Sequence, residues 1–311
     1  MTSTFSIVLP FFTLILAGYL ARRTGVLGPH ATRELNRLVV HLALPALLFD
    51  LLAQAAWRDI WQPRFVAAFG LSAVAVFVLS SLVWMSQRRR LADAAIASLN
   101  ASYSNTGFLG LPLVLAALGR DAVPSAVVAT ILLVVLMALA MGLVELDVQG
   151  AQARPGGVLL KTAGSLLRSP LIVAPALGAC VSGFGWQAPE AGMRFVGALG
   201  AAAAPCALLT LGLFLAEPAE TPGRMAVRPV AFLVGLKLVA QPLLAWGLAW
   251  TFTLPPHLTG AAVLLAALPT GTGPFMLATH YDREKPITSN VAVISTVASV
   301  VTVSAFLALK F

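Results

Sequence analysis

The stretch SNTGFLGLP, residues 104–112, lies inside an apolar run that covers residues 94–118. Asn, Gly and Pro are poor helix formers, and in hydrocarbon a backbone group without a partner is strongly unfavourable. A helix that opens at this depth is tolerated only where its backbone is buried in protein or lines a wet cavity. The stretch therefore predicts a broken membrane helix, with a functional cavity at the break.

The rest of the sequence is that of a membrane protein with many spans. Its 311 residues are 59% hydrophobic and only 10% charged, and the mean hydropathy is +0.90. A soluble protein carries about 25% charged residues. We predict an all-α protein with ten apolar segments that cross the membrane. The segments run over residues 5–21, 36–56, 64–86, 94–118, 122–146, 163–184, 190–216, 228–250, 258–281 and 287–309.

Charged residues predict the orientation. The loops after the odd-numbered segments hold fourteen Lys and Arg, and the opposite loops hold five. The positive-inside rule then places both termini outside, and we expect the inner membrane of a bacterium. The pI near 10.3 does not indicate a nucleic-acid partner, because the basic residues lie in short loops and form no face. Two isolated Cys are too few for a metal site, and we expect no cofactor.

The chain divides into two halves. Residues 147–162 form a cytoplasmic linker between a first five-helix repeat, 1–146, and a second, 163–311. Because each half has an odd number of spans, related halves must have inverted topologies. Two motifs recur at matching places: LPALLF around Pro45 pairs with APCALLT around Pro205, and NTGFLGLP pairs with LPTGTGPFMLA.

The paired breaks in the fourth and ninth segments predict a binding site near the bilayer midplane. Each second half-helix, beginning near Phe108 or Phe275, presents free N–H groups that suit a carboxylate. The C-terminal ends of the first halves suit a cation equally well. Glycines at the breaks let a ligand approach the backbone closely. Pro112, Pro269 and Pro274 mark the breaks, and the expected substrate-binding residues are Asn100, Ser104, Asn105, Thr106, Gly107, Thr270, Gly271, Thr272 and Gly273.

Two ionisable residues lie within spans. Lys237 is close to midplane depth in the eighth segment, where a charge costs at least about 2.5 kcal/mol. It either helps to bind the anion, or it neutralises the negative ends of the broken helices or pairs with Asp50. Asp50 lies in the outer third of the second segment and is either a proton-coupling residue or a carboxylate of an outer vestibule. Ser295, at helical spacing from Ser299, either lines the site or serves helix packing.

Three stretches resemble the auxin efflux carrier family of membrane transport proteins: NASYSNTGFLGLPLV (100–114), LPTGTGPFMLATHY (268–281) and ISTVASVVTVSAFL (294–307). The resemblance implies two inverted repeats of five helices, with crossed and broken fourth and ninth helices. Bile-acid symporters and sodium–proton antiporters share this fold. It also implies that the first, second, sixth and seventh helices form a scaffold that dimerises, while the other six move as an elevator. The short central linker, and Ser-Asn-Thr where plant exporters have an Asn-Pro pair, favour a small organic acid over auxin.

We therefore predict a secondary transporter or facilitator of a small organic anion, driven by the gradient of the solute, of protons or of sodium. HExxH, GxSxG and P-loop motifs are absent from the sequence, so we do not expect an enzyme. A sodium-coupled symporter of the bile-acid type is the nearest alternative. An intramembrane enzyme, a channel or a sensor are alternatives from other classes.

Overall fold

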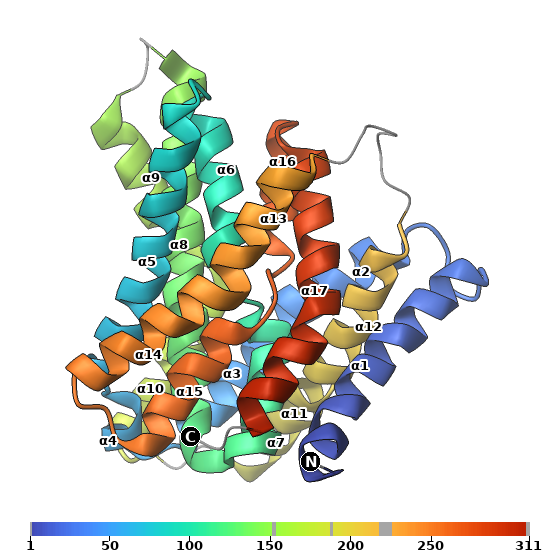
Figure 1. Ribbon diagram of the computed structural model, residues 1–311. Coiled ribbons are helices and arrows are strands. Elements are labelled where there is room, and N and C mark those ends of the chain that lie inside the picture. Colours follow the sequence, from blue (N-terminus) through green and yellow to red (C-terminus); the bar gives the residue numbers. More distant parts are fainter. Residues whose placement is uncertain (1, 151–153, 187–188, 218–225, 309–311) are drawn as a thin grey trace. The chain divides into compact units, whose positions relative to one another are not determined.

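The computed structural model describes residues 2–150, 154–186, 189–217 and 226–308, and these ranges are almost entirely helical (Figure 1). The helices of the first predicted half are α1 (Thr2–Arg23), α2 (Ala31–Leu38), η1 (Val39–Ala43), α3 (Leu44–Ala53), α4 (Trp57–Ile60), α5 (Pro63–Ser86), α6 (Leu91–Ser102), η2 (Thr106–Gly110), α7 (Leu111–Leu118), η3 (Arg120–Ala122) and α8 (Val123–Gln149). Those that follow are α9 (Pro155–Arg168), α10 (Pro170–Gly183), α11 (Glu190–Ala201), α12 (Ala203–Leu215), α13 (Val227–Gly235), η5 (Leu236–Ala240), α14 (Gln241–Thr251), α15 (Pro256–Ala267), α16 (Gly273–Tyr281) and α17 (Lys285–Ala308).

The all-α class is confirmed, and several helices are long and apolar enough to cross a membrane. The described residues contain six such helices, or seven if the bent pair α9 and α10 counts as one span. Thr106–Leu118 and Pro256–Ala267 are apolar but too short. These two are halves of the fourth and ninth segments, which the sequence predicts to be broken. The count of ten spans and their inverted repeat remain predictions.

The predicted linker 147–162 is helical at both of its described ends. Helix α8 continues to Gln149, and α9 begins at Pro155, a residue well suited to the first turn of a helix. Lys161 on α9 binds Glu145 on α8 at 2.8 Å, which packs the two helices together (Figure 1). The interpretation of this stretch as a polar connection therefore missed a helix, and residues 151–153 lie outside the described ranges.

Three widened π-helical turns share one sequence feature. The turns η1, η2 and η5 each end two residues before a proline, namely Pro45, Pro112 and Pro242. Proline has no N–H and its ring displaces the carbonyl four residues earlier, so the regular hydrogen-bond ladder fails there. A π-turn accommodates the local failure while the chain remains helical. Pro112 therefore marks the end of the widened turn rather than the break itself.

The chain forms two compact units that each draw on both predicted halves. The first unit comprises residues 1–63, 106–131 and 169–218, and the second comprises 64–105, 132–168 and 219–311. The first thus contains the first, second and seventh predicted segments and the sixth from residue 169 onward. The fourth, fifth and sixth segments are each divided, after Asn105, Ile131 and Arg168.

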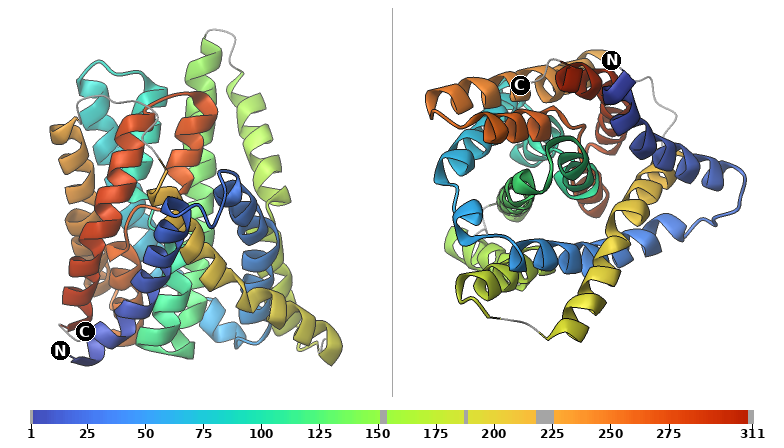
Figure 2. Two further views of the ribbon diagram at one scale, coloured as in Figure 1. Left: turned by 90° about the vertical axis from the view of Figure 1, so that its right-hand side faces the viewer. Right: turned by 90° about the horizontal axis from the view of Figure 1, so that it is seen from below.

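In the first unit, the close packing of α1 against α12 depends on two glycines. Helices α1 and α12 cross in close contact (Figure 2). A Cβ placed on Gly18 of α1 would overlap the Leu209 carbonyl, and one on Gly212 of α12 would overlap the Ile15 carbonyl. Small residues at crossings let membrane helices approach until their backbones touch, which increases van der Waals contact. Each helix therefore supplies one of the two glycines on which the contact depends.

We expect Gly212→Ala to lower the melting temperature of the purified protein by several degrees. The added methyl group overlaps backbone, and overpacking of this kind costs about 1–3 kcal/mol. Differential scanning fluorimetry in detergent measures the effect. The control is Gly197→Ala on the neighbouring α11, where no atom lies within 4 Å of the new Cβ. Equal melting temperatures for the two variants would contradict the packing argument.

In the second unit, ion pairs join the ends of three helices. Arg283, which follows α16, binds Asp93 of α6 at 2.7 Å, and Arg89 lies 3.8 Å from the Glu284 carboxylate. Glu284 has a side-chain exposure of only 10%. Burial, followed by repulsion from Asp93, raises the pKa of Glu284 and outweighs the two arginines. The charged form of Glu284 is therefore less favourable in the folded protein than in the unfolded chain.

We expect Glu284→Gln to raise the melting temperature at pH 8 by a few degrees. A carboxyl whose pKa is raised by folding destabilises the protein above that pKa, and the cost disappears as the pH falls through it. The gain from Gln should therefore shrink as the pH is lowered toward 5. Melting curves at the two pH values test this, with Glu190→Gln at an exposed position as the control. A variant less stable than the parent at pH 8 would show that the pair with Arg89 dominates.

Candidate functional site

Parts of the two predicted breaks, residues 103–105 and 269–271, lie side by side in the second unit and bond to each other. The Asn105 N–H donates to the Pro269 carbonyl at 2.9 Å, and the Gly271 N–H donates to the Tyr103 carbonyl at 2.9 Å. Between them, residues 104 and 270 form an isolated antiparallel β-bridge. We call this pairing of residues 103–105 with 269–271 the crossing. It satisfies backbone groups that neither broken helix can satisfy alone.

Neighbouring side chains hold the crossing in place. The Thr270 hydroxyl donates to the Asn100 carbonyl at 2.6 Å, and the Thr270 N–H donates to the Ser295 hydroxyl at 3.1 Å. The Asn100 amide nitrogen in turn donates to the Thr288 hydroxyl at 3.1 Å. The Ser104 hydroxyl, 3.5 Å from the Gln241 side-chain oxygen, also faces protein. Ser104 and Thr270 thus build the crossing rather than presenting free groups to a ligand.

The glycines at the breaks face protein side chains. A Cβ on Gly271 would lie 3.0 Å from the Tyr103 ring, and one on Gly273 would lie 3.1 Å from the same ring. A Cβ on Gly107, in the first unit, would lie 3.2 Å from Leu44 Cδ2. In this structure the three glycines therefore make room for Tyr103 and Leu44, whereas the sequence interpretation assigned that room to a ligand.

Polar groups without partners remain beside the crossing. Asn105 has an exposure of 4%, and among the described residues its Nδ2 atom has no hydrogen-bond partner. The buried Oδ1 atom of Asn100 likewise has no hydrogen-bond partner among these residues. Helix α16 begins at Gly273, and Thr272 before it forms no side-chain capping bond. The start of α16 therefore carries the partial positive charge of the helix dipole, although Pro274 at its second position has no N–H.

Three further predicted residues belong to the first unit. Thr106 begins η2 directly after the crossing, two residues before the expected start of the half-helix, and its hydroxyl accepts a bond from Thr130 at 3.0 Å. Gly107 lies in the same π-turn, and Pro112 is the second residue of α7. Their hydrogen bonds and packing are local to that unit.

The eighth predicted span supplies two buried polar side chains. Lys237, with an exposure of 0%, donates from Nζ to the Ala266 carbonyl at 2.6 Å. Gln241, also at 0%, donates from Nε2 to the Ser102 carbonyl at 3.0 Å. The contact of Lys237 favours the interpretation as a structural cation at a helix end. Gln241 was missed, although a second polar residue four positions after Lys237 in KLVAQP was a usable signal.

Asp50 lies in the first unit, on the wall of a small polar cavity. Its carboxylate accepts a hydrogen bond from Gln54 at 2.7 Å. The cavity has a volume of about 290 Å³, and its charged lining also includes Asp59, Arg120 and Asp121. The surroundings of Asp50 match the interpretation as a carboxylate of a vestibule.

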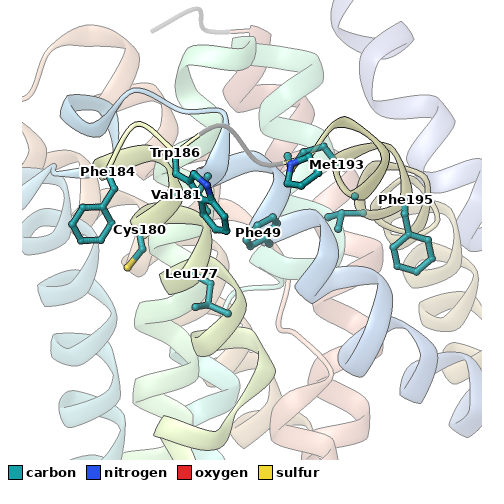
Figure 3. A pocket seen from close by; sticks show the side chains of 11 residues that line it. Phe49, Leu177, Cys180, Val181, Phe184, Trp186, Met193 and Phe195 are labelled. Atoms are coloured by element: carbon teal, nitrogen blue, oxygen red, sulfur yellow. The ribbon is translucent and has the colours of Figure 1, made fainter.

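A larger cavity of the first unit is apolar. It measures about 550 Å³ and lies among α3, α10 and α11, with Phe49, Leu177 and Met193 in its wall (Figure 3). None of the residues predicted to bind substrate lines it. A carboxylate here would lose its hydration without gaining donors, so this cavity does not suit an organic anion.

Comparison with known proteins identifies the family. The model of the family described as "Membrane transport protein" matches residues 3–307. The chain belongs to this family. A protein of Rhizobium meliloti (strain 1021) named "Putative malonate transporter" is 31% identical over 310 residues, covering 97% of this chain and 94% of its own length. An "Uncharacterized transporter" of Methanothermobacter thermautotrophicus is 27% identical and covers 94% of each chain.

Membership confirms the resemblance to the auxin efflux carriers and sets the broad class. The protein is an integral membrane transport protein, and its relatives are transporters rather than enzymes. A small-molecule substrate follows from this class.

We expect Gly271→Ala to destabilise this membrane transport protein by about 1–3 kcal/mol, because the new methyl group presses on the Tyr103 ring. In a Tyr103→Leu background the same change should cost clearly less. A double-mutant cycle on melting temperatures isolates the coupling. Gly235→Ala on α13, with no atom within 4 Å, serves as the control. Additive effects of the two changes would show that the ring does not set the requirement for glycine.

Proposed function

We propose that this protein carries a small organic anion, such as a carboxylate, across the membrane by alternating access, with the solute bound beside the crossing. The observation that carries the proposal is the buried side-chain Nδ2 atom of Asn105, which has no partner among the described residues and lies next to two unwound segments that bond to each other. A buried polar atom without a partner is costly, so its persistence at such a place favours a ligand that completes it.

The donors beside the crossing suit a carboxylate. Asn105 supplies side-chain N–H groups, and the start of α16 supplies the positive end of its helix dipole. Thr272 adds a hydroxyl, and hydrogen bonds from such donors to a charged oxygen are stronger than those between neutral groups. Lys237 contributes positive charge to the region through its place at the end of α15 rather than by direct contact.

The division into compact units supports movement of the elevator type. The first unit holds the predicted scaffold, namely the first, second and seventh segments and the sixth from residue 169, together with residues 106–131 of the fourth and fifth segments. The second holds the whole crossing, from Tyr103 to Gly271. We propose that the second unit carries the bound solute while the first remains fixed.

The aromatic residues support the proposed orientation. Trp57, Trp61, Trp186 and Trp250 are exposed, and each lies at the end of a segment on the side that the basic residues avoid. Trp is typical of membrane–water interfaces. We propose that this is the outer face of a bacterial plasma membrane and that both termini lie there.

Uptake into proteoliposomes tests the proposal. Malonate, the solute in the name of the Rhizobium meliloti relative, is the first probe. Malonamide is its neutral counterpart, with amides in place of both carboxylates. We expect malonate to be taken up and to raise the melting temperature, and malonamide to do neither, because only the anion is favoured by the positive helix end. Repeating the assay with sodium, with choline or with a pH gradient separates the three driving forces.

We expect Asn105→Ala to reduce uptake about tenfold or more, since it removes an interaction made only with the solute (about 1.4 kcal/mol per factor of ten). Gln149→Ala, which removes an exposed amide at the end of α8, is the matched control. Normal uptake by Asn105→Ala would remove Asn105 from the site. Equal uptake of malonate and malonamide would overturn the proposal for an anion. So would the absence of uptake of malonate, of malonamide and of other small carboxylates.

A further inference from the structure

Lys237 and Gln241 lie four residues apart on one helical span and are both fully buried. Lys237 is in the π-turn η5, and Gln241 is the first residue of α14. Residues four apart share a helix face. Polar side chains at this depth require internal partners, because neither lipid nor water is available to them.

Each side chain bonds to the C-terminal end of a different half-helix. Ala266, the acceptor for Lys237, is the residue before the last of α15. Ser102, the acceptor for Gln241, is the last residue of α6. The last carbonyls of a helix lack partners within it and carry its partial negative charge. The two side chains therefore cap the two half-helices that lead into the crossing.

The two caps differ in charge. Gln241 satisfies its carbonyl with a neutral amide, whereas Lys237 places at the end of α15 an amino group that carries a full positive charge when protonated. Among the described residues, Lys237 makes no ion pair with a carboxylate, and its Nζ atom bonds instead to the Ala266 carbonyl at the end of α15. Carbonyls at the ends of broken half-helices are the groups with which transporters of other folds coordinate small cations.

We propose that Lys237 is a tethered resident cation, which occupies the carbonyl site at the end of α15 where an alkali cation would otherwise be needed. Gln241 is the neutral counterpart at the end of α6. The crossing is then complete without sodium or potassium. The inference uses the same crossing as the proposed function, but it does not depend on which solute is carried.

The salt dependence of stability tests this. Wild-type protein and three variants are melted in detergent with NaCl, KCl or choline chloride at equal ionic strength. The wild type should melt at one temperature in all three salts. Lys237→Ala should melt lower in choline and recover by about 3 °C or more as sodium or potassium saturates the vacant carbonyl site.

Two other variants make the result specific. Lys237→Met fills the volume without a charge, so it should melt lower than wild type in every salt. Gln241→Ala loses the neutral cap, so it should melt lower without recovery in any salt. The recovery should therefore be found only in Lys237→Ala.

Several results would overturn the inference. One is a higher melting temperature of the wild type in sodium or potassium than in choline. A second is a Lys237→Met variant that melts at the temperature of the wild type. A third is a salt-dependent rise in the melting temperature of Gln241→Ala equal to that of Lys237→Ala. If Lys237→Ala does not fold, the melting temperatures of the wild type in the three salts and of Lys237→Met still test the inference. No solute is added, so a failure here is distinguishable from a failure to bind carboxylates.

Discussion

The second unit depends on two backbone hydrogen bonds between the broken segments, which water cannot replace inside a membrane. Tyr103 and Asn105 on one break pair with Gly271 and Pro269 on the other. An open helix inside a bilayer is strongly disfavoured, and two open helices that bond to each other remove much of that cost. The surrounding side chains add further hydrogen bonds that hold this pairing in place, such as the one from the Thr270 N–H to the Ser295 hydroxyl.

This constraint explains why the two broken stretches could be predicted to occur together. Asn, Gly and Pro within an apolar run are a local signal of a break, and a second run of the same kind at the matching place indicates a partner. Prolines also account for the π-turns, because a missing N–H acts within one helical turn. Features that depend on nearby residues along the chain were therefore accessible.

Features that depend on which side chain fills a given space were not accessible. The sequence shows that Gly271 is small, but not that the Tyr103 ring, rather than a ligand, lies against it. Lys237 was conspicuous because of its charge, yet only the structure shows that it points to the Ala266 carbonyl. Gln241 is a less unusual residue, and its importance depends on a carbonyl far away in the chain. Each of the two units is likewise built from segments far apart in the sequence, and no local sequence pattern predicts which segments join.

The short bridge between residues 104 and 270 has a consequence for how relatives can diverge. Along an extended segment, successive side chains point to opposite sides, so a shift by one position exchanges the residues that face inward and outward. Insertions or deletions at either break would therefore turn Asn105 away from its present surroundings. Evolution of selectivity in this protein should proceed by replacement of residues at constant length, with compensating changes on both strands of the bridge.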